Sequence, residues 1–240
     1  MAQTAQMLRH ERAKLANHAQ IVQADDIPQL LKATRSYAKS RDPVDLGFVQ
    51  YEGVFCTKAW EAEIVLISAE DLCGPMPGPR STAHYAAVPE IAAALYEAWD
   101  EALPGMDIVF AFTTRAPDAW LDGVYDLHLR SSRMTMNAAR FHQEYAAAAD
   151  ARAIAVAVQG AVPDAEVATI GVEQFAEARL GPAGPLLDLA EVPRDVQDGL
   201  AAIPRRKPGL SRKQREEFLL LNRSGLTGTE VAARKKDALA

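Results

Sequence analysis

The pattern of apolar and polar positions is helical at the start of the chain. Residues 3–24 contain no glycine or proline, and Leu8, Leu15 and Val22 recur every seven positions. This spacing predicts a helix with one apolar side. A second helix is expected before the end of this helical arm, residues 1–41. The apolar side of the arm is expected to pack on its own chain or to form a homodimer.

Between residues 42 and 204 short apolar runs alternate with amphipathic stretches of helical length. The apolar runs predict β-strands at 48–55, 63–68, 108–113, 124–130, 153–158 and 167–170. Amphipathic spacing predicts one helix that begins at Pro89 and further helices at 134–152, 173–179 and 194–202. Continuous apolar strands need cover on both faces. The pattern therefore predicts an α/β body, residues 42–204, with a mixed sheet and helices on both faces.

Residues 205–240 form a basic helical tail that begins with a linker containing proline and glycine. Ser211 is expected to cap one helix, and Thr227 or Thr229 a second. The string LSRKQREEFLLLNRSGLTGTEVAARK resembles the opening of the helix-turn-helix module of sigma factors and LuxR-type regulators. The resemblance covers fewer than 30 residues and implies a helix pair that contacts nucleic acid. In those modules the next helix reads the major groove, and the residues up to Ala240 do not include it, so nonspecific phosphate contacts are expected.

Charge is distributed unevenly along the chain, whose total is −6. Residues 1–41 carry a net charge of +4, residues 42–204 a net −16 and residues 205–240 a net +6. A basic tail on an acidic body predicts that the tail binds nucleic acid nonspecifically or an acidic protein partner. The residues expected to make these contacts are Arg205, Arg206, Lys207, Arg212, Lys213 and Arg215.

Candidate catalytic residues lie on or after predicted strands. Asp126 and His128 stand two positions apart, so a strand would place them on one face, either as a general acid/base pair or as a solvated polar surface. Asp71 and Arg115 follow predicted strands, and ligands of open α/β sheets bind beyond the carboxyl ends of the strands. The sequence contains no GxSxG, HExxH, GxGxxG or P-loop lysine pattern. No metal site is expected, and no particular cofactor is indicated.

The remaining features are those of a soluble cytoplasmic protein. No apolar run approaches the ~18 residues needed to span a bilayer, and Cys56 and Cys73 have no disulfide or metal-binding spacing. Abundant alanine and arginine are typical of bacteria with GC-rich genomes. We therefore expect an intracellular binding or regulatory protein that acts through its basic tail. The alternative is a small-substrate hydrolase or transferase with a pocket near Asp71, Arg115 and Asp126.

Overall fold

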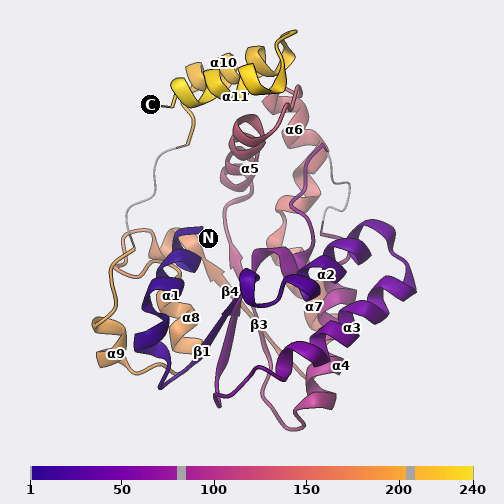
Figure 1. The fold of residues 1–240 in the computed structure, drawn as a ribbon, viewed down its shortest axis with the longest axis vertical. Helices are drawn as coiled ribbons and strands as arrows, with labels where there is room; N and C mark the ends of the chain where they lie inside the picture. Colours follow the sequence, from indigo (N-terminus) through magenta and orange to yellow (C-terminus); the bar gives the residue numbers. More distant parts are fainter. Residues whose placement is uncertain (1, 80–84, 204–208, 240) are drawn as a thin grey trace. The chain divides into compact units, whose positions relative to one another are not determined.

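The computed structural model divides into two compact units (Figure 1), and it describes residues 2–79, 85–203 and 209–239. Unit 1 consists of Met1–Met76, Tyr85–Arg115 and Ala151–Arg205. Unit 2 consists of Pro77–His84, Ala116–Asp150 and Arg206–Ala240. The basic tail therefore belongs to the same unit as the middle of the predicted body.

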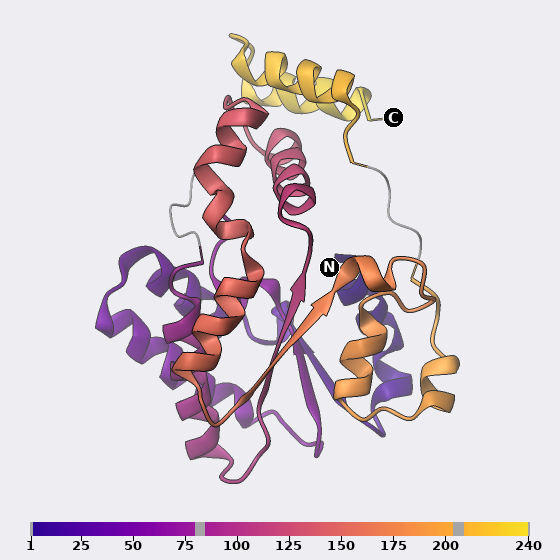
Figure 2. The same cartoon turned by 180° about the vertical axis from the view of Figure 1, so that it is seen from behind.

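The described residues of unit 1 include four short strands in two parallel pairs. They are β1 (Gln20–Gln23), β2 (Val65–Ser68), β3 (Val109–Thr114) and β4 (Glu166–Gly171). β1 pairs with β2, and β3 pairs with β4. Figure 2 shows the arrowheads of β3 and β4 pointing the same way. The expected mixed sheet is not found, because every described pairing is parallel and the pairs form two separate two-stranded sheets.

Most of unit 1 is helical. Its helices are α1 (Ala2–Leu15), α2 (Pro28–Ser40), α3 (Pro43–Thr57), α4 (Val88–Ala102), α7 (Ala151–Ala161), α8 (Ala183–Leu189) and α9 (Arg194–Asp198). Three strands are followed by 3-10 turns, which are η1 (Ala24–Asp26), η2 (Glu70–Cys73) and η4 (Val172–Phe175). Proline occupies the first turn of α2, α3 and α4, where its missing N–H costs no hydrogen bond.

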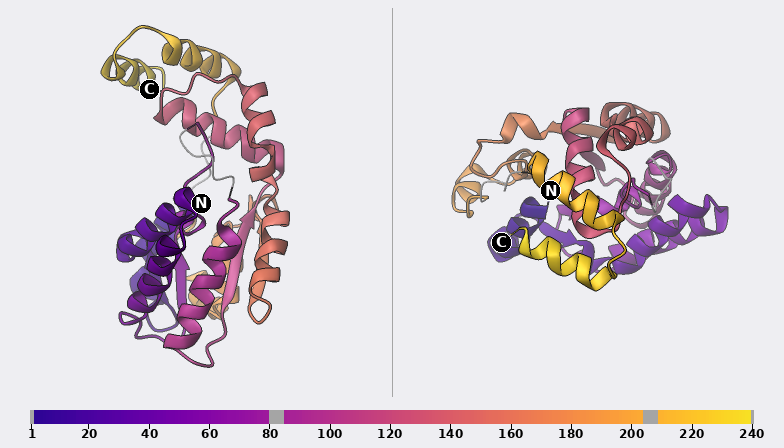
Figure 3. Two further views of the ribbon diagram at one scale, coloured as in Figure 1. Left: turned by 90° about the vertical axis from the view of Figure 1, so that its right-hand side faces the viewer. Right: turned by 90° about the horizontal axis from the view of Figure 1, so that it is seen from above.

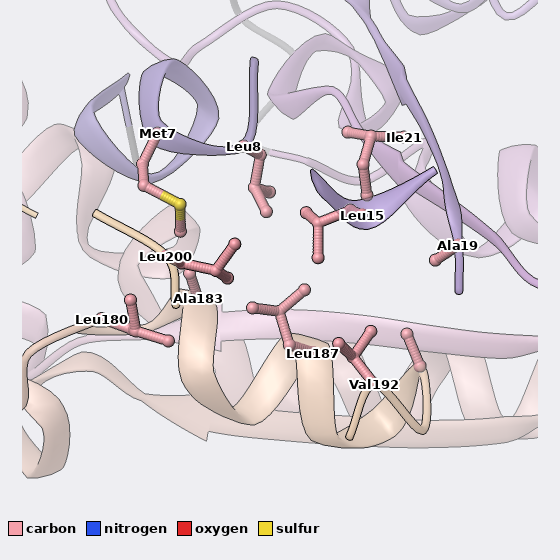
Figure 4. Packing of buried hydrophobic residues seen from close by; sticks show 11 residues of the cluster. Met7, Leu8, Leu15, Ala19, Ile21, Leu180, Ala183, Leu187, Val192 and Leu200 are labelled. Atoms are coloured by element: carbon pink, nitrogen blue, oxygen red, sulfur yellow. The ribbon is translucent and has the colours of Figure 1, made fainter. Parts of the chain in front are cut away.

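The N-terminal helix is held in unit 1 by its own apolar side. Leu8 and Leu15 are fully buried, and they share one core with Ile21 and with Leu187 of α8 (Figure 4). Full burial of a leucine stabilises a fold by about 1.5–3 kcal/mol. The two leucines that suggest a homodimer are therefore occupied within the chain. The helix is also shorter than expected, because Val22 lies in β1.

Unit 2 contains a cluster of aromatic side chains on two of its helices, α5 (Pro117–Ser131) and α6 (Ala138–Tyr145). The other helices described in this unit are α10 (Arg212–Arg223) and α11 (Gly228–Asp237), with the 3-10 turn η3 (Ala146–Ala149). The buried Phe141 ring lies 5.4 Å from that of Tyr125 and 4.6 Å from that of Tyr145, measured between centroids. The two tail helices run side by side (Figure 3) and begin at capping boxes with Ser211 and Thr227. The sequence predicts the Ser211 cap, and of its two alternatives for the second helix the structure has Thr227. Within the described ranges, no helix combines the length and apolar character needed to cross a bilayer.

Three predicted strands are helical in the structure. Residues 48–55 lie in α3, residues 124–130 in α5 and residues 153–158 in α7. In α7 the abundant alanine favours a helix over a strand. In α5 the buried residues follow helical spacing, and they include Leu121, Val124, Tyr125 and Leu129. The strands expected at 63–68, 108–113 and 167–170 are present as β2, β3 and β4.

Candidate functional site

The carboxyl ends of β3 and β4 form a shared polar edge in unit 1. Their register places Thr114 beside Gly171, so the residues that follow both strands leave at the same end of the pair. Arg115 follows β3 directly, and Glu173 lies in η4 after β4. Arg115 Nε is 3.9 Å from Glu173 Oε1, and the two side chains are 30% and 51% exposed. The guanidinium is therefore partly exposed to solvent.

Asp71 lies just beyond the end of β2, in the turn η2. Arg35 Nη1 is 3.4 Å from Asp71 Oδ2, and Thr34 Oγ1 donates a hydrogen bond to the Asp71 carbonyl at 3.2 Å. Both partners come from α2, so this helix fixes the turn. Asp71 and Arg115 thus stand at strand ends in the same unit, as the sequence predicts, although their strands belong to different sheets.

Near the end of β1, arginine side chains of α1 pair with Gln23 of β1 and Asp26 of η1. The side chain of Gln23 accepts a hydrogen bond from Arg9 Nε at 2.9 Å and donates one to the Ala5 carbonyl at 2.6 Å. Arg12 Nη2 lies 2.5 Å from Asp26 Oδ2. Burial opposes ionisation of Asp26, but the hydrogen bonds from Arg12 and the Gln23 N–H, together with the charges of Arg12 and Arg9, outweigh it and lower the Asp26 pKa. These contacts therefore hold α1 against the end of β1.

Neither cysteine has the electrostatic environment of a nucleophile. Burial raises the pKa of Cys73 to about 11, and the nearby carboxylates of Glu70 and Asp71 act in the same direction. Burial also raises the pKa of Cys56 to about 11. Both thiols are therefore protonated at neutral pH, where a thiolate would be needed for attack. In the part of the chain that the structure describes, no group of three or more His, Cys, Asp or Glu side chains is arranged to hold a metal ion.

Asp126 and His128 do not share one face, which both interpretations of the predicted strand required. Both lie on helix α5, where residues two positions apart point about 200° away from each other. His128 Nε2 is in hydrogen-bonding contact with the Pro77 carbonyl at 2.9 Å. A Cβ at Gly78 would lie 2.1 Å from the same nitrogen, so this contact requires glycine there. The strand predicted at 124–130 is therefore wrong, because these residues lie in α5.

Asp126 instead anchors the start of the tail. Its side chain accepts hydrogen bonds from the Leu210 N–H at 2.8 Å and from Arg215 Nε at 2.6 Å. The hydrogen bond to Asp126 is the main cause that raises the pKa of Arg215. A Cβ at Gly209 would lie 2.7 Å from Asp126 Oδ2, so the tail approaches through a glycine. Asp126 is therefore a structural anchor of unit 2, whereas the strand ends belong to unit 1.

Further hydrogen bonds hold the tail to the end of α5 and the loop after it. Asn222 Nδ2 donates to the Met134 carbonyl at 2.8 Å, and Lys235 Nζ donates to the Ser132 carbonyl at 2.8 Å. Arg133 donates in the other direction, to the backbone carbonyls of Asn222, Ser224 and Leu226. Docking of the tail is therefore specific within unit 2.

The six basic residues expected to bind a partner lie in different environments. Arg215 is engaged by acidic residues of α5. Arg212 is 93% exposed, and its Nε lies 2.9 Å from Glu216 Oε1. Lys213 is exposed and lines an open groove of about 620 Å³ on α10 and α11. The other three residues lie outside the described residues, and they are Arg205, Arg206 and Lys207.

Sequence reasoning missed an exposed apolar face on α3. Its four members are more than half exposed, and they are Val44, Phe48, Tyr51 and Phe55. The strand expected at 48–55 conceals this face, because a strand would divide alternate residues between two sides. The spacing of four, three and four residues is the helical signal that could have revealed it.

No family model, curated protein or solved structure matches this chain. The strongest candidate site is the edge of β3 and β4, because it combines an accessible guanidinium with the strand ends at which α/β proteins bind ligands.

Proposed function

We propose that this protein binds a small anionic substrate at the carboxyl edge of β3 and β4, with Arg115 as the residue that holds it. The parallel register is the observation that supports the proposal, because it brings Thr114 beside Gly171 and sets Arg115 directly beyond them. Ligands of open α/β folds bind beyond the carboxyl ends of parallel strands. A small-substrate hydrolase or transferase is the enzyme class that fits such an edge.

Arg115 has the chemistry that this function needs. A guanidinium presents a planar fork of donors that matches carboxylate and phosphate groups. The Arg115–Glu173 pair is solvent-accessible with 3.9 Å between its closest atoms, and such pairs contribute only ~0–1 kcal/mol. We expect an anionic ligand to compete with Glu173 for the Arg115 guanidinium. Asp71, just beyond the end of β2, is the candidate carboxylate for acid/base chemistry.

Inorganic phosphate and AMP are suitable probes for this site, in calorimetric titration and in thermal unfolding. A ligand at a hundredfold excess over Kd stabilises the folded state by about 2.7 kcal/mol, so a raised Tm is expected. Arg115→Gln removes the charge and is expected to weaken binding by roughly tenfold or more. Arg140→Gln is the control, because Arg140 forms an exposed pair with Glu144 at 3.7 Å. The proposal fails if neither probe binds or if both variants bind alike.

A second candidate function is protein binding by the tail. The groove on α10 and α11 is lined by three leucines, Leu220, Leu221 and Leu226, together with the cations Lys213 and Arg234. Leu220 is 68% exposed. Exposed leucines fit the apolar side of an amphipathic segment of a partner protein, with acidic side chains of that segment against Lys213 and Arg234 and away from Glu216 and Glu217.

Nucleic-acid binding by the described tail residues is expected to be weak and indifferent to sequence. Glu216 and Glu217 line the same groove and would repel a phosphate backbone. Titration of scrambled duplexes at low and high salt should show affinity that falls steeply as salt rises. Tight binding to one sequence that survives high salt would contradict this expectation.

We also propose that the protein works in the cytoplasm. Cys56 and Cys73 are both free. Disulfides form and persist in oxidising compartments and are rare in the cytosol. Two unpaired thiols therefore support a reducing location.

A further inference from the structure

One face of α3 is apolar and exposed to solvent. Val44 is 66% exposed, Phe48 56%, Tyr51 63% and Phe55 52%. The rings of Tyr51 and Phe55 stack with their centroids 6.4 Å apart. We call these four residues the α3 stripe. Contiguous exposed apolar surface of this kind marks interaction sites.

The spacing of the α3 stripe is that of a helix-packing surface. Steps of four, three and four residues confine its members to an arc of about 60° around the helix. The opposite side of α3 already packs inside unit 1, where α3 contacts α2 and α4. On that side Val49 is fully buried, and a Cβ at Gly53 would lie 3.0 Å from Ala98. The helix therefore has a second packing face that is turned outward.

We propose that the α3 stripe docks on the α3 stripe of a second copy of this chain, with the two helices antiparallel across a two-fold axis. An axis that passes between Phe48 and Tyr51 sets Phe48 against the partner's Tyr51 and Val44 against the partner's Phe55. Each side chain of the stripe then meets an apolar side chain. A two-fold contact of this type closes the assembly at two copies.

Charges at the two ends of α3 favour the antiparallel arrangement. Asp42 caps the helix, Asp45 lies in its first turn, and Lys58 follows its last residue with Nζ 4.9 Å from the Phe55 ring centroid. Antiparallel pairing brings each Lys58 near the acidic first turn of the other copy and opposes the two helix dipoles. Asp45 and Glu52 share one flank of the stripe, so like charges face one another along that flank and weaken the dimer.

The size of the stripe sets the strength of the dimer. A buried aromatic side chain covers about 150–250 Å², so the half-exposed stripe offers on the order of 400 Å² per copy. A standard stable interface buries about 800 Å² per partner. The dimer is therefore weak and depends on concentration. A lipid surface is the less favourable occupant, because anionic headgroups would repel Asp45 and Glu52.

Sedimentation equilibrium of the full chain over a wide range of concentration should show a monomer–dimer equilibrium. Replacing Phe48 and Tyr51 together by Ser is expected to leave a monomer at every concentration. Because both residues are exposed, the double variant should keep the Tm of the parent chain. The control replaces Val156 and Leu127 by Ser, which are 69% and 45% exposed, and it should dimerise like the parent. A parent chain that stays monomeric, or a dimer that survives the Phe48 and Tyr51 changes, would overturn the proposal.

An exchange of charges tests the antiparallel arrangement. Lys58→Glu places acid against acid at both ends of the pair and should weaken the dimer by roughly tenfold. Adding Asp45→Lys to that variant should restore the affinity. A double variant no tighter than the single one would rule out antiparallel pairing. Stripe-dependent cosedimentation with phosphatidylserine vesicles, by a chain that stays monomeric, would assign the stripe to a membrane and overturn the proposal.

Discussion

Asp126 is the least exposed acidic residue among those that the structure describes, at 4%. Its carboxylate accepts hydrogen bonds from the Leu210 N–H and from Arg215, so both of its oxygens are bonded to donors of the tail. Asp126→Asn keeps the shape but removes the charge opposite Arg215. We expect the free energy of unfolding of unit 2 to fall by about 2–4 kcal/mol. Urea unfolding tests this, with the exposed Asp118→Asn in the same helix as control. Equal effects of the two changes would contradict the role given to Asp126.

Asp26 is the residue for which pH dependence has a definite sign. Its pKa in the folded chain lies below its ordinary value, because the hydrogen bonds from Arg12 and Gln23 and the charges of Arg12 and Arg9 together outweigh the effect of burial. A depressed pKa means that its contribution to stability is complete above the unfolded pKa of about 3.9 and is lost as pH falls through the lower folded pKa. The stability difference between the parent chain and Asp26→Asn should therefore be largest near neutral pH and shrink below pH ~4. A difference that stays constant down to pH ~2 would contradict this.

At the scale of elements, local signals identified some segments and could not identify others. The runs of β2, β3 and β4 are apolar and rich in branched or aromatic side chains, and Ser211 and Thr227 mark the two tail helices by their caps. Residues 124–130 fit a strand in a short window, and only the burial of Leu121 together with Tyr125 and Leu129 shows a helix. Local periodicity alone could not settle that choice.

Some features of the candidate site could likewise be predicted from the sequence, and others could not. The positions of Asp71 and Arg115 follow from a general rule about strand ends, so the sequence could suggest them. The partnership of Asp126 with Arg215 joins residues 89 positions apart, and no local pattern encodes it. Asp126 therefore looked available for chemistry when it was in fact bound to the tail.

Docking of α10 should depend more on apolar burial than on its exposed charges. Phe218 is fully buried, whereas Arg212 and Lys213 are exposed. Truncation of a buried aromatic costs about 3–5 kcal/mol, and loss of an exposed ion pair costs at most about 1 kcal/mol. Phe218→Ser should therefore raise hydrogen exchange across residues 211–222 far more than joint replacement of Arg212 and Lys213 by Gln. The reverse order would show that exposed charge holds the helix.

At the scale of the whole molecule, contacts between residues define the two compact units, and these units differ from the segments that composition suggests. The expected division into residues 1–41, 42–204 and 205–240 rests on changes in charge and on Pro- and Gly-rich stretches. Unit 2 instead joins the segment between β3 and α7 to the tail. The tail contributes Phe218 and Asn222 as buried side chains, and these cannot be removed without exposing what they cover.

Removal of residues 204–240 is therefore expected to leave unit 1 folded and to loosen α5 and α6. Unit 1 keeps its two strand pairs and the core that contains Leu8 and Leu187. Helix α5 loses the Arg215 guanidinium opposite Asp126 and the Asn222 amide that bonds to the Leu129 carbonyl. Amides of α5 and α6 should exchange much faster in the shortened chain, while those of β3 and β4 stay protected. Unchanged protection of α5 would show that it is stable without the tail, and lost protection of β3 would show that the two units fold as one.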